Sequence, residues 1–398
     1  MSDPGLRRHD LDWIRIGAFL LLILYHVGMF YVPWDWHVKS PQPIAWLEPV
    51  MLLTNPWRLS LLFLVSGAAT RFMADKLAPG VLARQRTARL LPPLVFGMLI
   101  IVPPQSYYEI VEQLSFDQGY LAFYGRYLTA SGNWCDADGC LITPTWNHLW
   151  FVAYLLVYTL ALAGLIVWAK PALRGLEQQL ERLPAWALVV APIAFLGLAR
   201  AILLPRFGVT HTLVDDGYNH VLSFSMFLFG YLTAKSGIIR DRLIALRWPA
   251  LGLAICAYLA FSLYAWTWRD ATTAPAAGLV VTMRFVYAVD QWCAIVAILG
   301  FGARHLNRSH PALSYLTLAV FPYYIVHQTV IVVAGHHLAR VGLPQGLEAA
   351  LLIGLTVATC GVTYEIVRRT GLLRPLFGLK PEASAKSSPD RALPIQNG

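Results

Sequence analysis

The chain has 398 residues, of which 57% are hydrophobic and only 13% are charged. Soluble globular proteins carry about 25% charged residues, so this composition excludes a disordered or collagen-like chain and argues strongly against a soluble enzyme. Five cysteines are too few and too scattered for a disulfide scaffold or a zinc finger. The net charge of +9 is compatible with nucleic acid, but its distribution along the chain indicates a membrane instead.

Ten mainly apolar segments are long enough for bilayer-spanning helices, which need ~20 residues each. The segments are continuous and rich in Leu, Ala and Ile, without the alternation of an outer-membrane barrel. The sequence therefore predicts an all-α integral membrane protein, a bundle of about ten transmembrane helices. The expected spans are 11–32, 56–73, 88–104, 148–169, 185–204, 219–235, 248–268, 279–303, 313–335 and 347–368.

The positions of Lys and Arg give the orientation of these spans. With the N-terminus inside, the inner segments carry 22 of these residues and the outer segments carry 8. Such an excess is typical of cytoplasmic loops, so both termini are predicted to be cytoplasmic. We expect one transmembrane domain over residues 1–380 and a disordered cytoplasmic tail over 381–398, because the tail is rich in Ser, Pro and charged residues.

Two outer segments, 33–55 and 105–147, are long and contain aromatic and acidic residues. Trp36 and His37 lie in the first, where we expect them to bind a polar substrate. The alternative for such tryptophans is an interfacial belt. In the second, Cys135 and Cys140 are compatible with a disulfide in an oxidising compartment or with two free thiols.

The first expected helix contains ionisable residues, which are costly inside a membrane and mark candidate functional sites. Arg15 and His26 are eleven residues apart, which places them on one face, roughly 16 Å apart along the axis. Asp12 is positioned to pair with Arg15. The alternatives are an arginine that extends to the inner surface and a histidine that bonds to a backbone carbonyl.

Further polar residues lie in other expected spans. His327 is at about the same depth as His26, so the two are predicted to share a polar cavity, and Asp290 is placed to line it. His148 is expected nearer the outer mouth, and Arg58 opens the second span on the same side. Ser66 and Gly67 have small side chains and are more typical of a close contact between helices than of a binding site.

Three arginines, Arg84, Arg86 and Arg89, precede the third expected span on the inner side. Their planar guanidinium groups suit bidentate binding of phosphate, as in acyl-CoA. The alternative is that they only set the topology. The sequence shows no internal repeat, no P-loop and no metal-ligand pattern, so no permanently bound cofactor or metal is expected.

The spacing of Arg15 and His26 resembles the motif of the acyltransferase-3 family of integral membrane acyltransferases. Within that family the chain is similar to the glucans biosynthesis protein C branch, in which the pattern at 327–328 is often His-His, whereas this chain has His327 and Gln328. The similarity extends over nearly the whole chain and is carried by Leu11–Arg15, Trp36–Ser40, Arg58 through Gly67, His148–Phe151, Val281–Met283, Tyr324–His327 and Tyr364–Ile366.

The resemblance implies transfer of an acyl group, by analogy succinyl, from cytoplasmic acyl-CoA to a hydroxyl of a periplasmic glucan or related glycan. It places the protein in the bacterial inner membrane, with acyl-CoA as co-substrate. His26 would act as general base, with His327 beside it, and Arg15 would position the donor or stabilise charge. A relayed acyl-histidine and a direct transfer are both compatible with these residues.

A different class of function, a proton-coupled secondary transporter, would also use buried histidines and a membrane carboxyl such as Asp290. Inverted repeats would favour a transporter, and the sequence shows none. The acyl group, the acceptor and the oligomeric state do not follow from the sequence.

Overall fold

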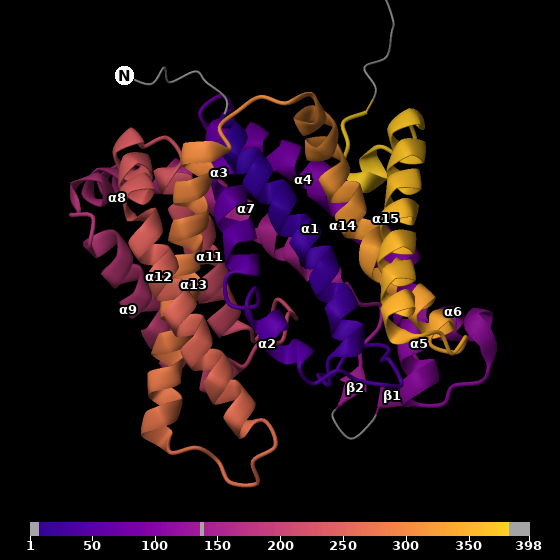
Figure 1. Ribbon diagram of the computed structural model, residues 1–398. Helices are drawn as coiled ribbons and strands as arrows, with labels where there is room; N and C mark the ends of the chain where they lie inside the picture. The colour runs from indigo at the N-terminus through magenta and orange to yellow at the C-terminus, as the bar shows by residue number, and fades with distance from the viewer. Residues whose placement is uncertain (1–7, 136–138, 382–398) are drawn as a thin grey trace, which may run out of the picture.

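The computed structural model describes residues 8–135 and 139–381, which form a helical bundle (Figure 1). The α-helices are α1 (His9–Tyr31), α2 (Leu47–Leu52), α3 (Arg58–Ala74), α4 (Pro79–Phe96), α5 (Pro103–Gln113), α6 (Gly119–Leu128), α7 (Trp150–Trp168), α8 (Lys170–Arg182), α9 (Ala187–Ile202), α10 (Leu204–Phe207), α11 (Gly217–Thr233), α12 (Gly237–Trp268), α13 (Ala277–His305), α14 (Pro311–Leu338) and α15 (Gln345–Arg369). A π-helical segment covers Gly97–Ile101, short 3₁₀ turns cover Asn147–Leu149 and Pro375–Phe377, and the strands are β1 (Trp134–Cys135) and β2 (Cys140–Leu141).

The predicted fold class is confirmed. Within the described residues, eight helical stretches are long and apolar enough to cross a membrane. Two more helices, α3 and α11, have 17 residues each and occupy the expected spans 56–73 and 219–235. All ten expected segments are therefore helical. The start of α1 and the end of α15 lie at the same face of the bundle, as the predicted topology requires (Figure 1).

Two expected spans have different bounds in the structure. The segment predicted at 88–104 is part of a 35-residue helical stretch, Pro79–Gln113, which contains the π-helical segment. The span predicted at 248–268 belongs to α12, which begins 11 residues earlier, at Gly237. In both cases the sequence pattern recognises only the apolar part of the helix. Pro92, Pro93 and Pro249 lie inside these helices without ending them, as membrane helices tolerate.

The central helix, α1, packs against α3, α13, α14 and α15. Asp10 and Asp12 lie in its first turn, where acidic groups favour a helix N-terminus. At its other end, the Lys39 ammonium donates to the carbonyl oxygens of Met29 at 2.5 Å, of Val32 and of Trp34 at 2.8 Å. These bonds satisfy carbonyls that a helix end leaves open and hold the 33–40 loop against α1.

The contact of α3 with α11 brings two backbones together. A Cβ atom on Gly67 would clash with the carbonyl group of Phe227, and one on Gly230 would clash with the carbonyl group of Leu64. Small residues are enriched where membrane helices approach closely, because packing rather than water exclusion drives their association. The packing role predicted for Gly67 is confirmed.

The described part of the outer segment at 105–147 has secondary structure. It contains α5, α6 and the β1–β2 pair, in which Cys135 is bonded to Cys140. Of the two possibilities that the sequence left open, the structure shows the disulfide. The proposed tail at 381–398 lies, apart from its first residue, outside the described residues.

Candidate active site

His26 and His327 are in direct contact. The Nδ1 atom of His26 lies 2.7 Å from the Nε2 atom of His327, and the rings are stacked with centroids 5.0 Å apart. Their helices, α1 and α14, approach closely where Gly335 faces Phe30, whose ring would meet an added Cβ at 3.0 Å. The predicted direct contact between these histidines is confirmed, but only His26 lines the cavity described below, because His327 is fully buried.

The hydrogen bonds determine which ring nitrogens carry protons. The Nδ1 atom of His327 lies 2.7 Å from the carbonyl oxygen of Tyr324, which only accepts, so Nδ1 is the donor. In the neutral ring, Nε2 of His327 then accepts from the Nδ1–H of His26. The Nε2 atom of His26 is left with an available lone pair and has no hydrogen-bond partner within the described part of the chain. This is the state that a general base requires.

Trp36 and His37 lie beside this pair. The Trp36 ring stacks on the His26 ring at 6.4 Å between centroids. His37 donates from Nδ1 to Glu109 at 2.6 Å, and its Nε2 accepts from the amide of Gln328 at 2.9 Å. Gln328, which departs from the pattern of the similar branch, therefore connects the loop histidine to α14.

His148 is closer to the pair than expected. It is buried, and its ring centroid lies 5.2 Å from that of His327. Its Nε2 donates to the carbonyl oxygen of Ile325 at 3.1 Å, and its Nδ1 accepts from Gln105 at 3.3 Å. Gln105 also accepts from Gln328 at 3.1 Å. Sequence reasoning missed Gln105, although a polar residue at the end of an apolar span was a usable signal.

His26 opens onto a cavity of about 700 Å³, here called the outer cavity. Of the residues predicted to bind substrate, Trp36, Arg58 and His148 line this cavity, whereas His37 bonds to Gln328 and is not part of the wall. The lining also includes four residues of the 208–216 loop that sequence reasoning missed: Val209, Thr210, His211 and Thr212.

Asp216 organises this loop. It is fully buried and accepts from the backbone N–H groups of Thr210 and His211 and from the Tyr154 hydroxyl. Burial alone would raise the pKa of Asp216, but these hydrogen bonds and that from Asn219 lower it. Burial lowers the pKa of His211 to about 4, so its ring, stacked 4.0 Å from Trp150, is neutral near pH 7.

A second cavity of about 120 Å³, the inner cavity, lies further toward the start of α1. Arg15, Arg86 and Arg89 line it. Arg86 is buried and donates to the hydroxyl of Thr70, and Arg89 donates to the carbonyl oxygen of Gly378 at 3.2 Å. Arg84 is exposed and does not line the cavity, so the predicted three-arginine site reduces to two of them together with Arg15.

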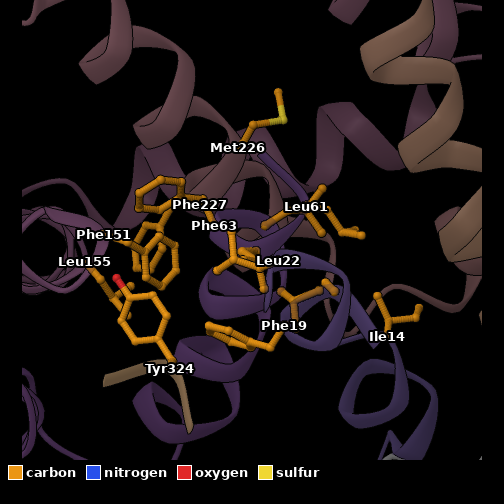
Figure 2. Packing of buried hydrophobic residues seen from close by; sticks show 14 of the residues in the cluster. Ile14, Phe19, Leu22, Leu61, Phe63, Phe151, Leu155, Met226, Phe227 and Tyr324 are labelled. Carbon is orange, nitrogen blue, oxygen red and sulfur yellow. The ribbon is translucent and has the colours of Figure 1, made fainter. Parts of the chain in front are cut away.

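Three aromatic residues, Phe19, Phe151 and Tyr324, line the boundary between the two cavities and form an aromatic layer there; Figure 2 shows their side chains in the core. Phe151 lines both cavities, Phe19 lines the inner one and Tyr324 the outer one. The Phe19 and Tyr324 rings are 5.4 Å apart, and both lie within 6.4 Å of the Phe151 ring. The Tyr324 hydroxyl donates to the carbonyl oxygen of His148, which links the layer to the histidine cluster.

Asp290 does not lie where the sequence placed it. It lines a separate cavity of about 730 Å³, bounded by α1, α3, α12 and α13. Its neighbour Gln291 points elsewhere and donates to Ser60 at 2.8 Å. Successive side chains on a helix point about 100° apart, and this one faces a different cavity from that at His26. In the described residues, no group of three or more His, Cys, Asp or Glu side chains is arranged to hold a metal.

The chain matches known proteins over nearly its whole length. The acyltransferase domain model of the acyltransferase-3 family matches residues 8–365. Similar relatives are the glucans biosynthesis proteins C of Salmonella paratyphi B, Salmonella enteritidis and Salmonella choleraesuis, each 25% identical over 97% of this chain and 98% of the relative. No solved structure matches the chain significantly. On the extent of the domain match, the chain belongs to the acyltransferase-3 family of membrane acyltransferases.

Proposed function

We propose that the protein is an O-acyltransferase of the bacterial inner membrane. It moves an acyl group from cytoplasmic acyl-CoA to a hydroxyl of a periplasmic glucan or related glycan. The resemblance of the sequence implies that this acyl group is succinyl. The observation that carries the proposal is the free Nε2 of His26 at the wall of the outer cavity, with an arginine-lined cavity beyond the aromatic layer. One cavity suits a polar acceptor and the other an anionic donor.

The inner cavity favours the donor side of the reaction. Arg86 and Arg89 present guanidinium groups that suit the phosphates of acyl-CoA, and Arg15 lies beside them. Because the cavity is only about 120 Å³, we assign to it the slim pantetheine arm, with the nucleotide at its mouth. The thioester then reaches His26 by displacing the rings of Phe19, Phe151 and Tyr324.

The outer cavity favours the acceptor side. Trp36, Trp146 and Trp150 offer flat apolar faces for sugar rings, and Asn55, Thr210 and His211 offer hydrogen-bonding groups. A sugar hydroxyl that donates to Nε2 of His26 is correctly placed to attack a thioester carbonyl. His26 takes the proton as the new C–O bond forms, and the C–S bond breaks as the tetrahedral intermediate collapses. The proton then passes from His26 to the leaving thiolate, and the base is regenerated.

His327 acts as a positioning residue in this scheme. Its bond to the Tyr324 carbonyl fixes its tautomer, and its Nε2 holds the Nδ1–H of His26. When His26 takes a proton, this bond stabilises the cation that forms. The arrangement resembles the acid that orients histidine in hydrolase triads, with a neutral ring in its place.

The test uses the purified protein in lipid nanodiscs with succinyl-CoA and a glucose oligosaccharide. We expect a succinyl mass increment on the sugar and an equal release of free CoA, both measured by mass spectrometry. In sealed vesicles, movement of a solute without consumption of acyl-CoA would instead support a transporter and contradict the proposal.

A further inference from the structure

Arg58 is a buried cation for which the described part of the chain supplies no anion. It is the first residue of α3, is 3% exposed and lines the outer cavity. Its Nη1 donates to the Thr54 hydroxyl at 3.4 Å, and its guanidinium carbon lies 3.5 Å from the centre of the Tyr25 ring. Within residues 8–135 and 139–381, no carboxylate pairs with it, and its Nε is buried without a hydrogen-bond partner.

This arrangement is costly unless a ligand completes it. A buried charge without a counter-ion loses its hydration, and the face of Tyr25 and one hydroxyl compensate for only part of that loss. Ionisable groups at membrane depth usually line a functional cavity and meet a charged partner there. The remaining donors of Arg58 are therefore available for an anionic group inside the outer cavity.

The position of Arg58 indicates which anion it binds. An oxyanion donor must lie 2.7–3.1 Å from the oxygen that develops charge, next to the hydroxyl held by His26. Arg58 and His26 line the same cavity and share Tyr25 as a neighbour: the cation lies against its ring, and the His26 ring is 6.1 Å from it between centroids. The far carboxylate of a short dicarboxylic acyl group, with its reacting carbonyl at His26, can extend within this cavity toward Arg58.

We propose that Arg58 binds the free carboxylate of a dicarboxylic acyl group of succinyl size and thereby determines which acyl group is transferred. This assignment rests on the proposed acyltransferase function. The bonds made and broken are those of that transfer, and the distal carboxylate remains ionised and unreacted throughout. Asp35, which also lines the cavity, is exposed and does not pair with Arg58.

The test compares a charged and a neutral donor, succinyl-CoA and propionyl-CoA, with one sugar acceptor. We expect Arg58→Gln to reduce the ratio of kcat/KM for succinyl-CoA to that for propionyl-CoA by roughly 10- to 100-fold, because a charge-assisted hydrogen bond to the acyl group is lost. Arg58→Lys, which keeps the charge without the bidentate fork, should give an intermediate ratio.

The matched control is Arg200→Gln. Arg200 also lies 3.5 Å from the centre of an aromatic ring, that of Tyr287, and donates to the Tyr218 hydroxyl at 3.0 Å, but it does not line the outer cavity. Its substitution should leave the donor ratio unchanged. An equal loss for both donors in Arg58→Gln would assign Arg58 to the oxyanion or to folding, and would overturn the inference.

Thermal unfolding supplies a readout without turnover. Succinyl-CoA should raise the unfolding temperature of the wild-type protein more than propionyl-CoA does, and Arg58→Gln should abolish that difference while keeping the ligand-free temperature. A difference that persists in Arg58→Gln would overturn the assignment. If the wild-type protein transfers from neither donor, the proposed function itself fails; if it transfers from both equally well, only the role of Arg58 fails.

Discussion

The outer and inner cavities hold their polar side chains in different ways. Around His26, the rings of His37, His148 and His327 each have both nitrogens in hydrogen bonds, and their backbone and amide partners fix the tautomers. In the inner cavity, Arg86 donates to the hydroxyl of Thr70, and Arg89 donates to the carbonyl oxygen of Gly378. A fixed site suits proton transfer, and a less constrained one suits binding of a long ligand that enters and leaves.

The largest effect is expected for His26→Ala, because the change removes the base and leaves the outer cavity intact. We expect transfer to fall by roughly 10²–10⁴-fold, the usual contribution of a general base. The measurement is acyl transfer by the purified variant in nanodiscs. Leu24→Ala is the control, since this exposed residue lies on the same helix and faces away from the bundle. Near-normal transfer by a well-expressed His26 variant would exclude the role.

A smaller loss is expected at His327, which acts through His26. His327→Ala should lower kcat by roughly 10²-fold with little change in the KM for acyl-CoA, because the base loses its tautomer control and not its donor site. His327→Gln should recover part of the activity, since its amide can donate to the Tyr324 carbonyl and accept from His26. Full activity in the alanine variant would reduce His327 to a structural residue.

The sequence predicted how far along its helix each of these side chains lies better than it predicted which residues surround it. Helical periodicity placed His26 and His327 at one level, but only the packing of α1 against α14 shows that their rings touch. The same reasoning placed Asp290 in the wrong cavity, because the direction of a side chain around α13 depends on the tertiary contacts. The 208–216 loop carries no periodic signal, so its part in the site required the structure.

Unlike the two histidines, the arginines of the inner cavity are predicted to affect binding of the donor and not the rate of the chemical step. Replacing Arg86 and Arg89 together by Gln should raise the KM for acyl-CoA by roughly 10-fold and change the KM for the acceptor little, because two phosphate contacts are lost on the donor side only. Steady-state kinetics with each substrate varied in turn measures both constants. The matched control is Arg84→Gln, which removes one exposed charge from the same helix without touching the cavity. An unchanged KM for acyl-CoA in the double variant would leave the arginines as topology signals alone.

The smallest effect is expected at Asp290, and it tests whether the outer cavity alone carries the chemistry. Asp290 is 3% exposed and lines the cavity between α1, α12 and α13, away from His26 and from the arginines. Within the described residues it has no hydrogen bond or ion pair, so Asp290→Asn removes a carboxyl group without breaking a network that involves the site. We expect kcat/KM to change by less than about threefold, which corresponds to less than ~0.7 kcal/mol. A membrane carboxyl that relays protons for transport would instead be indispensable. A large loss of acyl transfer in Asp290→Asn, with unfolding temperature unchanged, would therefore show that the third cavity is coupled to the reaction and that the division between a reacting cavity and a donor cavity is incomplete.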